Sequence, residues 1–306
     1  MTIQPSSSEN FIRTDFKPNN MPSGSVHRLY NGLRRFLKGN YLNWLALGLV
    51  SLMIFLSLFG DLIVPYPPQE MSLSSRLLPP SQIHFFGTDD YGRDVFSRVI
   101  SGAKISLAMA GMVLVFSASI GFFLGALAGL SGRLVDDVIM RITDLFLAFP
   151  ALLLAMAIAA TLGANLRNVM LALSAVYWPW YARMVRGQVL SLKEREYMLA
   201  STCLGASKPR LIFSHLLPNV APILITQISL DVGFVILSTS ALSFLGLGAQ
   251  PPTPEWGAML NDARLFIREA WWMSTFPGFA LALTVLGFNL LGDGLRDFLD
   301  PRIRKA

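Results

Sequence analysis

The stretch Trp44–Val64 reads WLALGLVSLMIFLSLFGDLIV, and its only charged residue is Asp61. A run of about 20 mostly apolar residues is what an α-helix needs to cross the hydrocarbon core of a bilayer. The run is too long for the apolar part of a signal peptide, lies far from Met1 and lacks a small-residue cleavage site after it. We therefore predict a retained membrane anchor.

The composition of the whole chain agrees with a membrane protein. Of the 306 residues, 53% are hydrophobic and only 14% are charged, and the mean hydropathy is +0.51. A soluble domain usually has about 25% charged residues. The single cysteine, Cys203, cannot form an intrachain disulfide. We predict an all-α membrane protein.

Five more apolar runs follow the first, which gives six predicted transmembrane helices. They are Trp44–Val64, Ile105–Leu130, Ile142–Leu162, Val169–Leu190, Ala221–Leu247 and Met273–Leu291. The fourth run carries Arg183 and Arg186 near its end, and Asp231 interrupts the fifth.

The distribution of Lys and Arg predicts the orientation of these helices. Loops on the cytoplasmic side are enriched in Lys and Arg. With the N-terminus inside, most of the 25 Lys and Arg residues fall in inside segments, so we predict that both termini are cytoplasmic. The net charge of +6 then needs no nucleic-acid partner, and no nucleic-acid fold signature is present.

Motifs for common catalytic and metal sites are missing from the sequence. There is no G-x-x-x-x-G-K-[ST], no H-E-x-x-H and no pair of cysteines for zinc. The three histidines, His27, His84 and His215, are far apart in the chain. We predict that the chain is not an enzyme, and that any ATP is hydrolysed by another chain.

A polar segment separates the fourth and fifth apolar runs. Glu194–Pro209 reads EREYMLASTCLGASKP. The composition predicts a helix over Leu190–Leu204, capped at its C-terminus by Gly205. Ser207 is an N-cap candidate for a second helix over Lys208–Leu217, which a Pro-Asn pair is expected to end. The orientation places this helix-turn-helix in the cytoplasm.

One face of the first of these helices carries two small residues between a tyrosine and a leucine. Tyr197, Ala200, Ser201 and Leu204 recur at spacings of three and four. Small side chains allow another backbone to approach closely, so the segment is either a docking element or an ordinary connecting loop.

The same segment resembles the cytoplasmic coupling loop of ABC importer permeases. In the peptide-type version, Glu-Tyr and a pair of small residues precede Gly-Ala-Ser. The matching residues are Glu196, Tyr197, Ala200, Ser201, Gly205, Ala206 and Ser207. Ser201 and Thr202 depart from the Ala and Arg that are usual in the family. The resemblance implies that these residues contact an ATPase.

Four other stretches resemble the same family, in the family's order. They are FGTDDYGRDVFSR (Phe86–Arg98), DDVIMRITDLFLAFP (Asp136–Pro150), SFLGLGAQPPTPEWGAMLNDAR (Ser243–Arg264) and LGDGLRDFLDPR (Leu291–Arg302). The family is the dipeptide/oligopeptide/nickel-type ABC importer permease, and within it the second permease of the pair.

The resemblance implies a fold and a set of partners. The fold is that of a type I importer permease in the bacterial inner membrane, surrounded by lipid. The partners are a second permease forming a heterodimer, two cytoplasmic ATPases and an external solute-binding protein. ATP and Mg²⁺ belong to the ATPases, and no cofactor is expected in this chain. The importer works by alternating access, driven through the coupling loop.

The predicted domain division combines this resemblance with the apolar pattern. A disordered basic cytoplasmic tail (1–40) precedes the first transmembrane helix and an external segment (41–100). The permease core (101–295) contains the coupling loop (190–219), and a cytoplasmic C-terminal tail (296–306) follows.

Three polar residues inside the apolar runs are candidates for the translocation path. They are Asp231, Gln227 and Asn289. Ionisable groups inside a membrane are costly and tend to face a bundle interior or an aqueous cavity. Asp231 could equally pair with a basic residue of the partner permease or serve in packing. Gly121, Gly125 and Gly129 form a ridge suited to close helix packing.

The alternative function is a secondary transporter or channel that acts without an ATPase. It would require an essential charge within the membrane, such as Asp231. A membrane-bound enzyme is a weaker third reading. The family transports dipeptides, longer peptides, glutathione, nickel complexes and opines, and we expect a peptide or peptide-like solute.

Overall fold

Residues 41–299 are described by a computed structural model, and all of their extended regular elements are helices. This confirms the all-α fold class. The tail predicted at 1–40 lies outside the described residues, as do residues 300–306 of the C-terminal tail. The elements in chain order are α2 (Tyr41–Ile63), the short helix η1 (Leu73–Ser75), α3 (Val95–Leu130), α4 (Arg133–Leu147), α5 (Ala151–Leu162), α6 (Leu166–Leu192), α7 (Glu196–Cys203), α8 (Lys208–Arg210), the π-helix η2 (Leu211–Leu216), α9 (Leu217–Phe244), α10 (Trp256–Ala263) and α11 (Trp272–Leu299).

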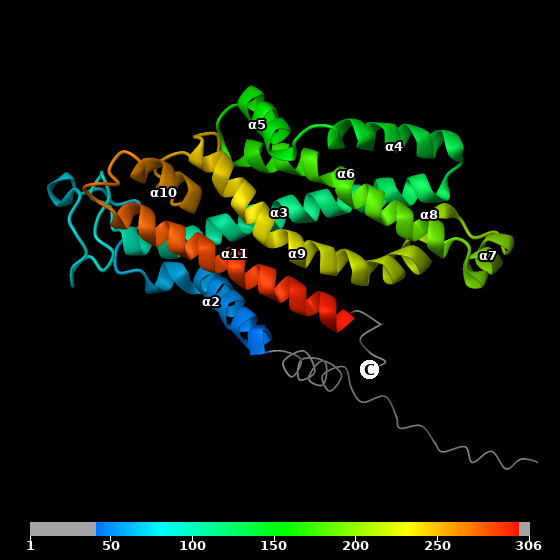
Figure 1. The fold of residues 1–306 in the computed structure, drawn as a ribbon, viewed down its shortest axis with the longest axis horizontal. Helices are drawn as coiled ribbons and strands as arrows, with labels where there is room; N and C mark the ends of the chain where they lie inside the picture. The colour runs from blue at the N-terminus through cyan, green and yellow to red at the C-terminus, as the bar shows by residue number, and fades with distance from the viewer. Residues whose placement is uncertain (1–40, 300–306) are drawn as a thin grey trace, which may run out of the picture.

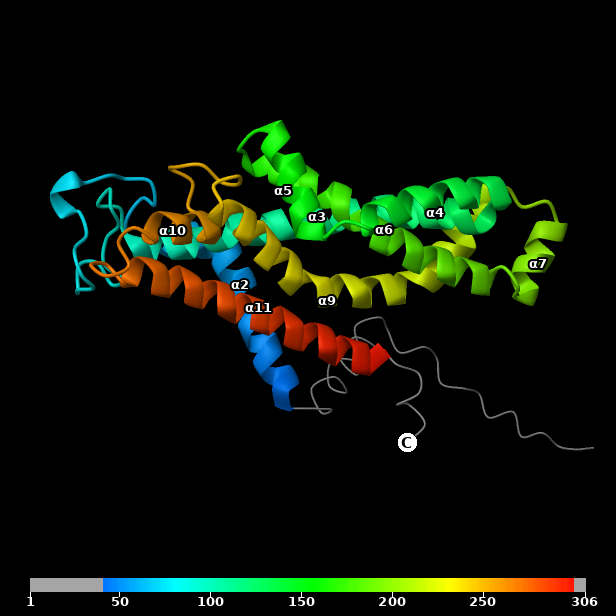
Figure 2. The ribbon, with the colours of Figure 1, turned by 45° about the horizontal axis from the view of Figure 1, so that its top comes forward.

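The described part of the chain is elongated, with different elements at its two ends. The segment 64–94 and α10 gather at one end of the long axis, and α7 lies at the other (Figure 1). The view turned by 45° shows the same separation (Figure 2). In both views α2 begins, and α11 ends, away from the end that holds α10.

By length and composition, four of the described helices could cross a membrane. They are α2, α3, the continuous helix Lys208–Phe244 and α11. The pair α4 and α5 would make a fifth span, although it is bent by 90°. Helix α6 has 27 residues but, with Arg183 and its aromatic residues, is not in this group. The six-span count and the cytoplasmic termini therefore stay predictions.

The third apolar run was predicted as one helix, and this was wrong. Helix α4 ends at Leu147, and α5 begins at Ala151 after Pro150. The α-helical conformation is disfavoured for a residue that precedes proline, because it clashes with the proline ring, and this favours the end of α4 before Pro150. The carbonyl of Pro150 then accepts the N–H of Leu154, which starts α5 on a new axis.

The helix predicted over Lys208–Leu217 was expected to end near Pro218, and it continues through it. Helices α8, η2 and α9 form one helix, Lys208–Phe244. A proline inside an α-helix lacks its N–H and clashes with the carbonyl four residues earlier. The wider π-turns of η2 directly before Pro218 accommodate that ring.

The glycine ridge on α3 packs directly against α6, as the sequence predicted. A Cβ atom added to Gly121 would lie 2.4 Å from the Cβ of Tyr181, and one added to Gly125 would lie 2.4 Å from the carbonyl oxygen of Ala182. A Cβ on Gly129 would meet Val189 at 2.6 Å. Real contacts at these distances do not occur, so only glycine permits this approach of the two backbones.

The segment 64–94 is organised around a buried arginine. The Arg93 side chain is fully buried, and its Nε donates to Oδ2 of Asp89 at 2.6 Å. Oδ1 of Asp89 accepts the backbone N–H of Arg93 at 2.9 Å. The sequence motif Phe86–Arg98 is therefore a folded ionic core. Breaking such a buried pair typically costs about 3–5 kcal/mol.

Two tryptophans form long-range hydrogen bonds at this end of the molecule, one to the segment 64–94 and one to α3. Trp272 Nε1 donates to the carbonyl oxygen of Thr88 at 3.0 Å, and Trp256 Nε1 donates to that of Val99 at 2.9 Å. Both rings are buried. The end of the molecule that holds α10 is thus packed together from segments far apart in the sequence.

A buried carboxylate adds to this packing. Glu255 accepts the N–H groups of Gly257 and Ala258, which caps α10, and the Ser240 hydroxyl of α9 donates to it at 3.3 Å. Burial raises the pKa of the Glu255 carboxyl, and the two backbone amides oppose that shift. One side chain therefore joins α10 to α9.

We predict that the Gly125→Ala substitution lowers the melting temperature of the purified chain. The added methyl group would overpack the α3–α6 contact, and overpacking typically costs about 1–3 kcal/mol. The control is Gly111→Ala in the same helix, because a Cβ there meets nothing within 4 Å. Thermal unfolding in detergent, followed by tryptophan fluorescence, measures both. Equal melting temperatures for the two variants would contradict the packing role.

Candidate functional site

The predicted site residues fall into two regions, and the first is the short helix α7. A single helix over Leu190–Leu204 was predicted, but α6 ends at Leu192 and α7 begins at Glu196. Arg195 has an extended backbone between them, with φ −73° and ψ 141°. The reason is tertiary packing, because Met198 is buried in an apolar cluster with η2 and α9, and this turns α7 away from the axis of α6.

The turn after α7 has the geometry of a Schellman motif. Gly205 has φ +80°, and its N–H donates to the carbonyl oxygen of Thr202 at 3.0 Å. The N–H of Ala206 donates to the carbonyl oxygen of Ser201 at 3.1 Å. These two bonds satisfy carbonyls that would otherwise be left over at the helix end. The predicted glycine C-cap is confirmed.

The start of the next helix is simpler than predicted. Ser207 occupies the N-cap position of α8, but its side chain makes no capping hydrogen bond. The Ser207 carbonyl accepts the N–H of Leu211 at 3.0 Å. Pro209 lies in the first turn, as expected.

The face of α7 that the sequence singled out is mostly exposed. Leu204 is 89% exposed and Tyr197 is 42% exposed, whereas Met198, on the buried side of the helix, is 2% exposed. Of the seven predicted coupling residues, five are exposed and two, Ser201 and Ala206, are half-buried; the exposed ones are Glu196, Tyr197, Ala200, Gly205 and Ser207. Ser201 Oγ shares a hydrogen bond with His215 Nε2 at 3.3 Å, which ties α7 to η2.

The last turns of α6, which lead to α7, are fixed to α4 by two ion pairs. Arg186 Nε and Nη2 donate to the two carboxylate oxygens of Asp136, each at 2.5 Å. Arg183 pairs with Asp144. The two arginines near the end of the fourth apolar run are therefore paired with aspartates of α4. Ionisable groups in membrane helices commonly pair in this way.

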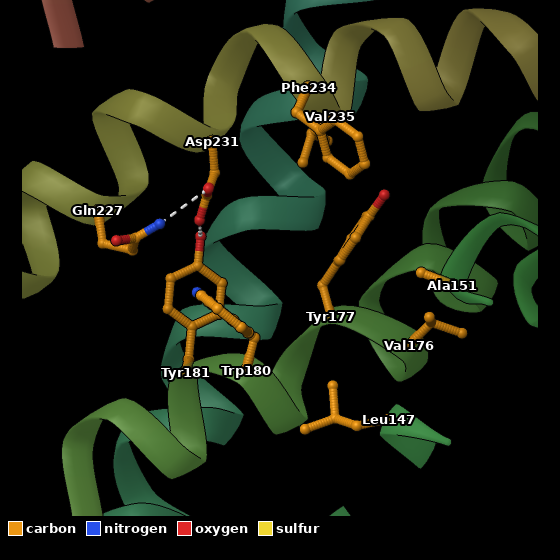
Figure 3. A pocket seen from close by; sticks show the side chains of 10 residues that line it. All are labelled: Leu147, Ala151, Val176, Tyr177, Trp180, Tyr181, Gln227, Asp231, Phe234 and Val235. Carbon is orange, nitrogen blue, oxygen red and sulfur yellow. Dashed lines mark hydrogen bonds between the residues drawn. The ribbon is translucent and has the colours of Figure 1, made fainter. Parts of the chain in front are cut away.

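The second region is a cavity between α5, α6 and α9 (Figure 3). Asp231 points into it from α9, and the Tyr181 hydroxyl of α6 donates to Oδ2 of Asp231 at 2.7 Å. Gln227 lies one helical turn earlier on α9, and its Nε2 donates to Oδ1 at 3.0 Å. Residues four apart lie on one face of a helix, so the sequence spacing already placed these two side chains together.

The third candidate, Asn289, does not line this cavity. It belongs to α11 and approaches α9 at Gly233, where an added Cβ would lie 2.3 Å from Asn289 Oδ1. Gly233 and Asp231 are two residues apart on α9 and so point to different faces of that helix. The structure brings Asp231 and Gln227 together, and places Asn289 elsewhere.

The position of Tyr181 follows from the glycine ridge. Its Cβ packs where Gly121 has no side chain, so the α6 backbone comes close to α3 and the tyrosine ring is directed toward α9. The Tyr177 hydroxyl, one turn earlier, shares a hydrogen bond with Ser238 Oγ at 3.0 Å. Two tyrosines of α6 thus reach polar partners on α9.

The remaining walls of the cavity are apolar and aromatic. The volume is about 260 Å³, and the other lining residues are Leu147, Ala151, Val176, Tyr177, Trp180, Phe234 and Val235. Sequence reasoning missed the aromatic residues. The available signal was the stretch YWPWY at Tyr177–Tyr181, an unusual density of aromatic residues inside an apolar run.

Metal chemistry finds no support in the part of the chain that the structure describes. Among residues 41–299, no group of three or more His, Cys, Asp or Glu side chains could hold a metal ion. The cavity offers one carboxylate, one amide and two phenol groups, which suits binding by hydrogen bonds and aromatic contact.

Two family models match this sequence. Residues 121–305 match the model described as binding-protein-dependent transport system inner membrane component. Residues 31–80 match the model described as N-terminal TM domain of oligopeptide transport permease C.

Relatives of the same kind match along most of the chain. The dipeptide transport system permease protein DppC of Alkalihalophilus pseudofirmus is 46% identical over 268 residues, which cover 88% of this chain and 88% of the relative. The nickel transport system permease protein NikC of Escherichia coli (strain K12) is 42% identical, with coverages of 88% and 97%. The probable D,D-dipeptide transport system permease protein DdpC of the same organism is 44% identical, with coverages of 89% and 92%.

A solved structure has a similar fold. A chain from the inward-facing MetNI methionine ABC transporter matches with a TM-score of 0.52, covering 66% of this chain and 96% of that chain. At 18% sequence identity this similarity concerns the fold alone.

We predict that Met198→Ala loosens α7 and that Leu199→Ala does not. Met198 is 2% exposed and Leu199 is 53% exposed, so only the first substitution leaves a cavity under the helix. Removing a buried Met side chain typically costs about 2–5 kcal/mol. Hydrogen exchange of the α7 amides, read by mass spectrometry, is expected to accelerate in Met198→Ala only. Equal protection in both variants would show that α7 is held by other contacts.

Proposed function

The chain belongs to the family of binding-protein-dependent transport system inner membrane components, and on this premise we propose that it carries a peptide or peptide-like solute across the bacterial inner membrane. It is the permease subunit of an ABC importer, with the fold of the type I importer permeases. The family membership favours an importer over a secondary transporter or channel, and over a membrane enzyme.

We further propose that the partners are a second permease, two cytoplasmic ATPases and an external solute-binding protein. ATP and Mg²⁺ are bound and hydrolysed on the ATPases. Two of the relatives are named for dipeptides and D,D-dipeptides, and these support a peptide-like solute. A third relative is named for nickel. A short peptide is the solute that agrees with most of these names.

The observation that carries the coupling role is the position of α7. This helix projects at the end of the molecule opposite the segment 64–94 and α10 (Figure 1). It is anchored by Met198 and ends in a rigid Schellman turn, and its other face is exposed. An anchored helix with an exposed apolar side chain, Leu204, can dock on a partner and transmit a movement to α6 and α9.

The movement has a defined route into the membrane helices. Met198 contacts the apolar cluster that includes Leu211, Leu216 and Val220 at the start of the Lys208–Phe244 helix. The same helix carries Asp231 further along. We propose that closure of the ATPases pushes on α7, and that the helix Lys208–Phe244 moves against α6 to open and close the path.

A reconstituted importer tests the function as a whole. Proteoliposomes containing this chain, the second permease, the ATPases and the binding protein are supplied with radiolabelled dialanine. We expect uptake that requires both ATP and the binding protein. Dialanine uptake at the same rate in vesicles that contain this chain without ATPases would overturn the importer mechanism, and its absence from the full importer would overturn the dipeptide assignment.

We predict that Leu204→Asp weakens association with the ATPases. Leu204 is 89% exposed, so the substitution leaves the fold of this chain intact but places a charge in the docking surface. Loss of a central interface contact is worth about 2 kcal/mol or more, or more than about tenfold in affinity. Affinity purification of this chain, with quantification of the ATPase that follows it, makes the measurement.

The matched control for this prediction is Leu73→Asp. Leu73 is 73% exposed but lies in η1, in the segment at the other end of the molecule. This variant is expected to purify with the ATPases as the unchanged chain does. Retention of the ATPases by Leu204→Asp would show that the exposed face of α7 is not the docking surface.

A further inference from the structure

Asp231 is a carboxylate that lacks a counter-ion within the described chain. Its hydrogen bonds come from the Tyr181 hydroxyl and the Gln227 amide, which are both neutral groups. The arginines of α6 that follow Tyr181 in sequence, Arg183 and Arg186, are paired with Asp144 and Asp136 of α4. No Lys, Arg or His is among the ten residues that line the cavity.

The carboxylate also retains room for another donor. An ionised carboxylate offers about four acceptor positions on its two oxygens. Tyr181 and Gln227 each occupy one position, on different oxygens. A third donor approaching through the cavity can therefore bind Asp231 without displacing either neighbour.

The walls around Asp231 suit a cation as well. Tyr177, Trp180, Tyr181 and Phe234 surround the cavity, from α6 and α9 (Figure 3). The faces of aromatic rings carry negative electrostatic potential and attract ammonium groups within about 6 Å. An anion would be repelled by the Asp231 charge, so the cavity disfavours it.

We propose that this cavity binds the protonated amine of the transported solute, and that Asp231 selects for it. The inference rests on the proposed function and specifies the chemical class of solute: an organic cation or a zwitterion with a free ammonium group, such as the amino end of a short peptide. The volume of about 260 Å³ is slightly below the range of about 300–1,000 Å³ for complete small-molecule sites. The cavity therefore receives the amine end, and the remainder of the solute lies outside it.

The charge preference of the cavity is measured by thiol labelling, without any transport. Ala151 lines the cavity and is half-buried, so Ala151→Cys in a Cys203→Ser background places a reporter thiol there. The complete importer is labelled with cationic aminoethyl methanethiosulfonate or neutral hydroxyethyl methanethiosulfonate. Each rate is divided by that of free cysteine with the same reagent.

We expect the cationic reagent to be favoured at Ala151→Cys. Adding Asp231→Asn, which keeps the shape of the side chain, is expected to reduce that preference about tenfold, since it removes the one charged group of the cavity lining. The control is a separate chain that keeps Ala151 and the native Cys203, which is exposed on α7. Its labelling ratio is expected not to change with Asp231→Asn.

A competition arm keeps Asp231 in place and so does not depend on the stability of the variant. Dialanine amide carries one ammonium group, and N-acetyl-dialanine amide has the same backbone without the charge. We expect only the first to slow labelling of Ala151→Cys.

Several results would overturn the proposal. They are equal protection by the two amides, protection by neither, or a labelling preference that survives Asp231→Asn. If a basic residue of the second permease paired with Asp231, it would neutralise the carboxylate, and the importer would show no preference for the cationic reagent. That result would also count against the proposal. Failure of ATP-dependent uptake with the labelling preference intact would instead count against the proposed function alone.

Discussion

The close contact between α3 and α6 is the interaction on which the rest of the structure depends. Gly121, Gly125 and Gly129 leave no side chain between the two backbones. In lipid, helix association gains little from the hydrophobic effect and relies on close van der Waals packing, which small residues permit. Because α6 is held this way, its tyrosines face α9 and its arginines face α4. One ridge therefore sets both the cavity and the base of α7.

The molecule uses polar groups differently at its two ends and in its middle. At the end that holds α10, the buried charged groups Arg93 and Glu255 have partners within the chain: Arg93 pairs with Asp89, and Glu255 accepts from backbone amides. At the other end, α7 leaves most of its polar and apolar side chains exposed. In the middle, Asp231 is hydrogen-bonded but not neutralised by the described chain. A packed end, a cavity with one carboxylate and an exposed helix at the opposite end agree with the proposed roles of these regions.

Much of the fold was predictable because it depends on local rules. Apolar runs of sufficient length specify membrane helices, and Gly205 specified the turn after α7. The errors came where tertiary packing overrode local preference. The break between α6 and α7 follows the burial of Met198, and the continuation through Pro218 follows the π-turns of η2. Neither a distant apolar cluster nor a change in helix type is visible in a local pattern.

The sequence by itself determined the helical membrane class, the family motifs, the glycine ridge, and the pairing of Gln227 with Asp231 on one face of α9. These depend on spacing along a single helix. Only the tertiary structure decided that Tyr181 donates to Asp231, that Tyr177 and Trp180 line the same cavity, and that Asn289 lies on another face. The physical reason is that a cavity is formed by side chains from separate helices. Their relative rotation is set by side-chain packing between helices, which the order of residues in one helix does not specify.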